Sequence, residues 1–167
     1  MVDKEPSPEI GASLEDAARE FLRLDRIAVA GVSREPRAAA NAIYRKLRKA
    51  GKSVVAVNPH AAEVEGDPCF HSLSEVAPAV DGVVVVTPPA DTKDVVRECI
   101  QSGIRQVWIH QSFGRGSMSM DAVALGRANG VRVIPGGCPL MFCDPVDFGH
   151  RCIRWILGRT GSLPRSC

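Results

Sequence analysis

Five short apolar segments alternate with helical patterns along this chain, and this alternation limits the folds it can adopt. The first segment, Ile27 to Ala30, runs directly into Gly31 and a polar loop, and a helical pattern follows from about Arg37 to Ala50. Apolar runs of this length are typical of strands that are buried on both faces of a parallel sheet. Strands that alternate with helices form a sheet with helices on both faces, joined by right-handed crossovers. The sequence therefore predicts an α/β fold, a single doubly wound Rossmann-like domain with a five-stranded parallel sheet.

The other four strands are predicted at residues 53–57, 82–87, 104–110 and 131–134. Longer helices are predicted at 14–24, 91–102, 119–129 and 146–157, each beside a capping residue or a glycine, with a short helix after Ser72 and a loop over 60–71. On this basis the chain divides into an N-terminal tail with a short helix (1–25), a ligand-binding domain (26–160) and a C-terminal tail (161–167).

The composition argues against several classes of partner. The net charge is only +2 and aromatic residues make up 5% of the chain, so neither a basic surface nor a base-stacking platform for nucleic acid is expected. No apolar stretch is long enough to span a membrane, and the acidic, proline-containing N-terminus does not resemble a signal peptide. We therefore expect a cytoplasmic protein with a small-molecule nucleotide ligand, and the sequence leaves open whether it forms a homodimer.

The six cysteines contain no Cys-x-x-Cys pair, which favours free thiols in a reducing compartment over disulfides. One group, Cys138, Cys143, His150 and Cys152, has the residue types of a metal site, but its spacing is not that of a zinc site. No metal site is predicted.

The ligand site is expected where the predicted strands end. In doubly wound sheets, ligands bind outside the carboxyl ends of the strands, and a phosphate binds the turn that opens the following helix. Glycine and polar residues stand at these ends, in the segments Gly31-Val32-Ser33, Asn58-Pro59, Thr87-Pro88, His110-Gln111 and Gly136-Gly137-Cys138. Gly31→Val is expected to block a phosphate while leaving the sheet intact.

The first loop departs from the pattern of a dinucleotide-binding loop. It has one glycine, in Gly31-Val32-Ser33-Arg34-Glu35-Pro36, where Gly-x-Gly-x-x-Gly has three. The second strand ends at Asn58 and not at the acid that binds the ribose hydroxyl groups of NAD. Because Arg34, Arg37, Lys52 and His60 lie in nearby predicted loops, the pattern favours an adenine nucleotide with an additional phosphate over NAD.

Residues 27–134 resemble the CoA-binding domain family of small Rossmann-like proteins and, more distantly, the N-terminal domain of the succinyl-CoA ligase α subunit. The resemblance rests on Gly31-Val32-Ser33, the Val57-Asn58-Pro59 segment, Gly66, the Ser72-Leu73 pair and the segment from Gly103 to Trp108. It implies coenzyme A or an acyl-CoA as the ligand, with the pyrophosphate on the loop from Gly31 to Ser33. It also implies that Asn58 and Pro59 flank the nucleotide or the pantetheine, and that Thr87 and Pro88 contact the adenine side.

The residues predicted to contact this ligand are Gly31, Val32, Ser33, Arg34, Arg37, Asn41, Val57, Asn58, Pro59, His60, Thr87, Pro88, His110, Gln111 and Cys138. No catalytic residue is predicted, because no Gly-x-Ser-x-Gly elbow surrounds Ser33 and the sequence names no carboxylate partner for His110. Cys138 is either a small buried side chain or a thiol that meets the CoA sulfur, and the sequence leaves both roles open. The ligase carries its phosphorylated histidine in another domain, so its chemistry is not expected here.

Three functions remain open at this stage, one of which is an interaction domain that uses the fold without a ligand. The favoured one is a non-catalytic module that binds or senses coenzyme A or an acyl-CoA. The alternative is an NAD(P)-binding oxidoreductase or redox sensor, which the missing glycines and the missing acid disfavour.

Overall fold

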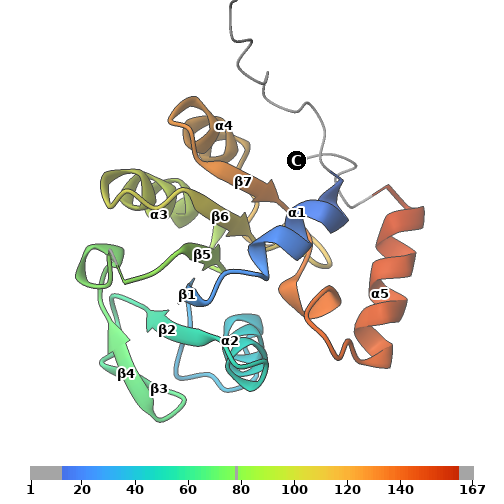
Figure 1. Cartoon of the computed structure of the whole chain (residues 1–167), viewed down its shortest axis with the longest axis horizontal. Coiled ribbons are helices and arrows are strands. Elements are labelled where there is room, and N and C mark those ends of the chain that lie inside the picture. The colour runs from blue at the N-terminus through green and yellow to red at the C-terminus, as the bar shows by residue number, and fades with distance from the viewer. Residues whose placement is uncertain (1–12, 78, 162–167) are drawn as a thin grey trace, which may run out of the picture.

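A mixed sheet with helices on both faces forms the described part of the chain, residues 13–77 and 79–161 of a computed structural model (Figure 1). Within these residues the sheet has seven strands in the order β3-β4-β2-β1-β5-β6-β7. Their bounds are Arg26–Ala30 (β1), Ser53–Val57 (β2), Glu63–Val64 (β3), Asp67–Phe70 (β4), Gly82–Val85 (β5), Gln106–Ile109 (β6) and Arg132–Pro135 (β7). Residues 1–12, Pro78 and residues 162–167 lie outside the described residues, so most of the C-terminal tail expected at 161–167, including Cys167, is not described.

The α/β class and the five expected parallel strands are confirmed, but the total of five strands is wrong. The segment expected to be a loop over 60–71 contains β3 and β4, which form a small hairpin at one edge of the sheet. β4 pairs in parallel with β2, and β3 pairs antiparallel with β4. These strands are short, each begins with an acidic residue and β4 contains Pro68, so they lack the apolar run that marks the other five.

The order of the parallel strands reverses direction once, at β1. Counted along the chain without β3, the parallel strands stand in the order 3-2-1-4-5-6. The chain therefore leaves β1 toward one edge of the sheet and returns to place β5 on the other side of β1. A crevice for ligands forms outside the carboxyl ends of the strands at such a reversal.

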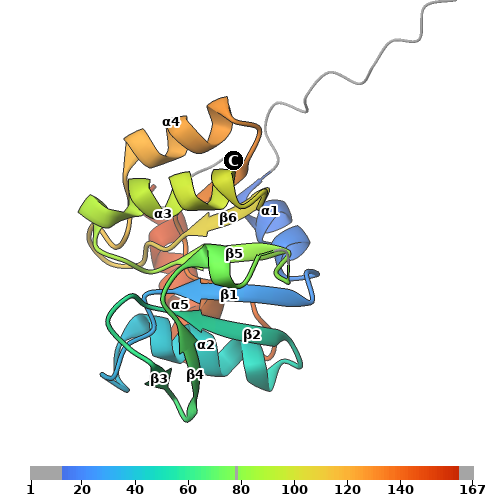
Figure 2. The same ribbon diagram turned by 90° about the vertical axis from the view of Figure 1, so that its left-hand side faces the viewer.

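The helices cover the two faces unequally (Figure 2). One face carries α1 (Leu14–Phe21), α2 (Ala39–Lys49) and α5 (Phe148–Arg159), and the other carries α3 (Pro89–Gln101) and α4 (Met120–Ala128). Three of these helices follow a residue whose side chain accepts a hydrogen bond from an N–H group of the first turn. These capping residues are Ser13 for α1, Ser119 for α4 and Asp147 for α5. Such caps satisfy donors that the helix itself leaves unpaired. Two 3₁₀ turns, η1 (Leu73–Glu75) and η2 (Pro139–Met141), complete the described secondary structure.

Trp108 on β6 anchors the core on the α1 side. Its side chain is fully buried, and its Nε1–H donates a 2.8 Å hydrogen bond to the carbonyl oxygen of Gly136. The Phe21 ring of α1 meets the indole edge to face, with ring centroids 5.5 Å apart. The burial of apolar surface with the indole N–H satisfied fixes α1 on the sheet.

Gly31 lies unusually close to the neighbouring strand. Its φ is +107°, and a Cβ atom at this position would stand 2.3 Å from the carbonyl oxygen of Val86. The Gly31 N–H donates to the carbonyl oxygen of Val57, so the residue is held from both sides. Gly31→Val would therefore disturb the sheet as well as the loop, and the expectation that this substitution leaves the sheet intact is wrong.

We predict that Gly31→Ala lowers the free energy of unfolding by about 3 kcal/mol or more, because it combines a left-handed backbone with a clash against backbone atoms. Gly51→Ala is the matched control, since Gly51 also has a positive φ, of +84°, but nothing lies within 4 Å of its added Cβ atom. The control should cost about 1–2 kcal/mol. Urea denaturation measures both values, and equal losses would contradict the close contact at Gly31.

Candidate functional site

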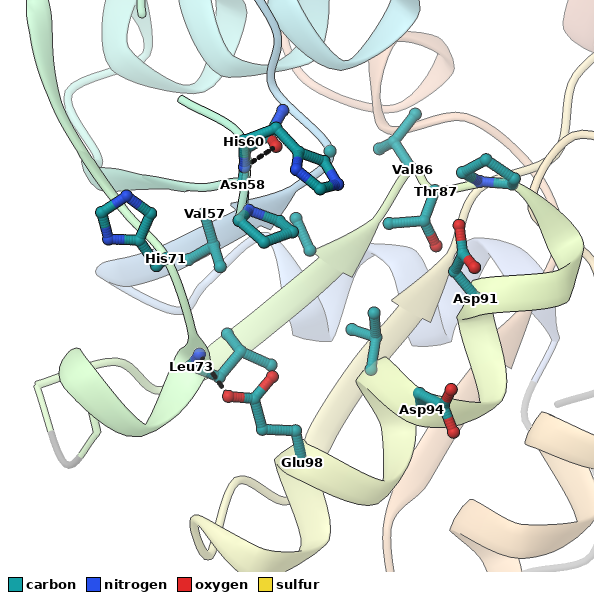
Figure 3. Close-up of a pocket in the computed structure, with 15 residues that line it drawn as sticks. Val57, Asn58, His60, His71, Leu73, Val86, Thr87, Asp91, Asp94 and Glu98 are labelled. Carbon is teal, nitrogen blue, oxygen red and sulfur yellow. Dashed lines mark hydrogen bonds between the residues drawn. The ribbon is translucent and has the colours of Figure 1, made fainter. Parts of the chain in front are cut away.

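A cavity of about 570 Å³ opens at the carboxyl ends of β1, β2 and β5, where the strand order reverses (Figure 3). Residues at the ends of these strands line one part of it, α3 lines another, and the segment after β4 closes a third. The lining residues are Ala30, Gly31, Val57, Asn58, Pro59, His60, His71, Leu73, Val86, Thr87, Pro88, Asp91, Asp94, Val95 and Glu98.

Two buried or partly buried carboxamides hold the loop that borders this cavity. Asn41, on α2, accepts a 3.0 Å hydrogen bond from the Ser33 N–H and donates one of 2.7 Å to the Ser33 carbonyl oxygen. Asn58, at the end of β2, donates a 2.8 Å bond to the carbonyl oxygen of Val32 and accepts one from the His60 N–H. Both side chains therefore fix the loop backbone in this structure, a role that the sequence analysis had not assigned to them.

The donors that this loop can offer to a phosphate follow from these contacts. The Ser33 N–H already has a partner, but the Ser33 hydroxyl only accepts, from the Glu35 N–H, and so keeps its proton free to donate. No side chain caps the N-terminus of α2 at Ala38, which leaves first-turn N–H groups available. The exposed side chains of Arg34 and Arg37 supply positive charge on the same loop.

A smaller hollow of about 240 Å³ lies beside the loop, and Ser33, Arg34 and Asn41 line it together with residues of the β3–β4 turn. Glu65 in that turn accepts hydrogen bonds from the Asn41 Nδ2 and the Arg45 Nη1, each 2.7 Å long. The Asn41 hydrogen bond, together with Arg45, lowers the pKa of the Glu65 carboxyl group. The charged carboxylate therefore ties the edge hairpin to α2 and to the loop.

Acidic side chains from α3 form one wall of the main cavity. Asp91, Asp94 and Glu98 occur at helical spacing, so they project from one side of α3 (Figure 3). Glu98 accepts hydrogen bonds from the N–H groups of Leu73 and Ser74 and so caps η1. No lysine or arginine among residues 13–77 and 79–161 lines this cavity, and its histidines, His60 and His71, lie on the side away from α3.

Besides Val32 and Arg37, three of the predicted residues line neither hollow. His110 is 7% exposed, and burial lowers its pKa to about 4. Gln111 donates from its backbone to the Gly137 carbonyl oxygen and from its side chain to the Gly114 carbonyl oxygen. Cys138 is buried in the core on the α1 side, and burial raises the pKa of its thiol to about 12. A thiol in this environment is protonated and packs as a small apolar side chain.

The structure thus brings part of the predicted set together. Gly31, Val57, Asn58, Pro59, His60, Thr87 and Pro88 line the main cavity, Ser33, Arg34 and Asn41 line the smaller one, Val32 is buried beneath the loop, and Arg37 is exposed on it. The acidic side of α3 was not predicted, although the helical spacing of its acidic residues is visible in the sequence. His71 and Leu73, whose place depends on the unpredicted β4, were not predicted either.

Two further classes of site are not found in the described ranges 13–77 and 79–161. No group of histidine, cysteine and acidic side chains there is arranged to hold a metal ion. None of the helices in these ranges has the length and apolar character needed to cross a membrane.

Comparison with known proteins places this geometry in a family. Residues 25–144 match the family described as CoA binding domain. The chain belongs to the CoA-binding domain family. This CoA-binding domain is 28% identical over 125 residues to the α subunit of an ADP-forming acetate–CoA ligase II from Pyrococcus furiosus, a match that covers 71% of the chain and 27% of the ligase subunit.

Other relatives of this CoA-binding domain differ in size. An ADP-forming acetate–CoA ligase I from Archaeoglobus fulgidus is 26% identical over 122 residues, which cover 67% of this chain and 17% of the ligase. The chain therefore spans about a quarter or less of these two ligase chains. A solved structure of a hypothetical protein from Pyrococcus horikoshii aligns with a TM-score of 0.73 and 26% identity, and covers 86% of this chain and 98% of that one.

The buried histidine yields a pH prediction for this CoA-binding domain. Because the pKa of His110 is lowered in the folded state, the unfolded chain binds the proton more readily, so stability rises with pH. The contribution of His110 is fully present above about pH 6.5 and is lost as the pH falls toward 4, with a total of about 3 kcal/mol.

His110→Asn should therefore flatten the fall in the free energy of unfolding between pH 6.5 and 4, as measured by urea denaturation at each pH. His71→Gln is the control, because His71 is exposed. An unchanged slope in the His110 variant would contradict the assigned cause.

Proposed function

We propose that this protein binds coenzyme A or an acyl-CoA in the cavity at the reversal of strand order. The observation that carries the proposal is the position of this cavity in a chain that belongs to the CoA-binding domain family. The cavity of about 570 Å³ is large enough for a substantial part of such a ligand. The rest of the ligand would lie along the loop from Gly31 to Arg37.

Charge divides the proposed site into two parts. The phosphates would lie at the loop, near the Ser33 hydroxyl, the uncapped start of α2 and the guanidinium groups of Arg34 and Arg37. A helix N-terminus stabilises anions through free N–H groups and its dipole. The main cavity, with Asp91 and Asp94 on its wall, would repel phosphates and would accept hydrogen bonds from hydroxyl, amide or amino groups.

The proposal is that the protein binds its ligand without catalysing a reaction. Among the described residues that line the main cavity, only Thr87 has a hydroxyl group, and it is hydrogen-bonded to the Thr92 hydroxyl group, not to a histidine or a carboxylate. An activated nucleophile requires an adjacent base. This arrangement supports a binding or sensing module, and the ligase activity of the two curated relatives is not carried over to it.

The five described cysteines have free thiols, which fits the reducing environment of the cytoplasm. We include a cytoplasmic location in the proposal on this ground.

A thermal-shift titration tests the ligand. CoA at a hundredfold excess over its Kd should stabilise the protein by about 2.7 kcal/mol and raise Tm by about 5–10 °C, because it binds only the folded state. Dephospho-CoA should give a smaller and less salt-dependent shift, since it lacks the 3′-phosphate that Arg34, Arg37 or His60 would neutralise. A larger shift with NAD than with CoA, at equal concentration and ionic strength, would overturn the proposal in favour of the oxidoreductase or redox sensor.

A cavity-filling substitution tests the location. Val95 on α3 lines the cavity and is partly buried, so Val95→Trp should fill the space and weaken CoA binding at least about tenfold in calorimetry. Arg97→Trp is the matched control, because Arg97 is an exposed residue of the same helix and does not line the cavity. If both variants bind CoA as the parent protein does, the ligand lies elsewhere.

A further inference from the structure

The outer face of α5 exposes an apolar stripe that the fold does not use. Phe148 is 81% exposed and Trp155 is 61% exposed, and partly exposed Cys152 lies between them at helical spacing. These residues and Arg151 border a shallow hollow of about 280 Å³. In Figure 1, α5 stands at one side of the molecule.

The opposite face of α5 holds the helix on the rest of the protein. Leu157 is buried in the core, Ile153 packs against that core, and the Arg154 guanidinium group stacks on the Phe142 ring at 5.3 Å from its centroid. The apolar stripe is therefore not needed to attach α5. A large aromatic pair left in water is typical of an interaction surface.

The two ends of α5 carry opposite charge. Asp144 and Asp147 precede the helix and are exposed, whereas Arg159 ends it and stacks on the Trp155 ring at 4.7 Å from its centroid. Within the described part of the chain Asp147 is paired with His150 of its own helix, whereas no salt bridge includes Asp144 or Arg159. The surface thus runs from acidic, through apolar, to basic, which makes it complementary to its own reversed copy.

We propose that α5 pairs antiparallel with α5 of a second copy of this chain, about a two-fold axis between Arg151 and Cys152. Reversal about this point brings Phe148 opposite the second copy's Trp155, because the two positions are equally far from the axis. The same reversal brings Arg159, at the end of α5, toward the acidic segment that precedes the second copy's α5 and contains Asp144 and Asp147. Each contact occurs twice, as an isologous interface requires.

The flanks of this pair differ. Cys152 of each copy lies near the axis on one flank, and Arg151 of each copy lies on the other flank, where the exposed guanidinium groups can extend into water. One helix pair buries much less than the roughly 1,600 Å² of a standard interface. The dimer is therefore weak and depends on protein concentration.

Sedimentation equilibrium over a wide range of concentration tests this association. The average mass should rise from the 17.9 kDa of the monomer toward twice that value. Trp155→Ala should raise the dimer Kd at least about tenfold, because buried aromatic anchors dominate such interfaces. Phe113→Ala is the matched control, since Phe113 is 63% exposed on a different loop, and it should leave the dimer Kd unchanged. A monomer at every concentration, including one whose α5 binds a different protein, would overturn the proposal.

Charge reversal tests the orientation. Asp144→Arg or Arg159→Asp alone should raise the dimer Kd several-fold, because each places like charges opposite one another. The double variant should recover the Kd of the parent protein. Failure of the double variant to recover would contradict the antiparallel register.

Thiol cross-linking tests the axis. Cys167 lies outside the described residues, so it is replaced by serine in every sample, and a short bifunctional maleimide then joins accessible thiols. We expect a cross-linked dimer that disappears in Cys152→Ser. A cross-link that persists without Cys152 would contradict the axis. These measurements use no CoA, so their outcome is independent of the proposed ligand.

Discussion

The candidate site depends on one close contact, between Gly31 at the end of β1 and the carbonyl group of Val86 after β5. A side chain at Gly31 would push the ends of β1 and β5 apart. These are the two neighbouring strands at which the strand order of the sheet reverses. Because the contact is made by backbone atoms, the loop can turn toward α2 immediately after β1. The cavity therefore opens directly at the end of the sheet and not beyond a longer excursion of the chain.

The loop after this contact is held by side chains and not by a glycine-rich backbone. Asn41 and Asn58 bind three loop groups between them, the N–H and carbonyl groups of Ser33 and the carbonyl group of Val32. Glu65 then fixes Asn41 from the edge hairpin. A loop that is already ordered loses little conformational freedom when a ligand binds, which raises affinity without any additional contact. Side chains thus order this loop without the second and third glycines of a dinucleotide-binding loop.

The sequence predicted the elements that bury apolar runs and missed those that do not. β1 and β5 are rich in apolar residues, whereas β4 contains Pro68 and gains its place by pairing with β2 and β3. The same limit applies to the site. Site residues at strand ends could be predicted because parallel strands end at the same edge of the sheet. The acidic residues of α3 could not be assigned to the site, because the sequence does not tell which face of that helix meets the cavity. His110 and Cys138 stand near strand ends, yet their side chains point into the protein, a direction that strand position alone does not determine.

The edge hairpin has a consequence beyond the placement of Glu65. A sheet edge with unpaired backbone groups is a template on which another chain can add a strand and begin aggregation. Here the edge strand β3 has only two residues, and it runs opposite to the strands beside it. Exposed Glu63 adds a charge to it. So short and charged an edge offers an incoming strand too few hydrogen bonds to hold it, and sheet growth stops on this side of the molecule.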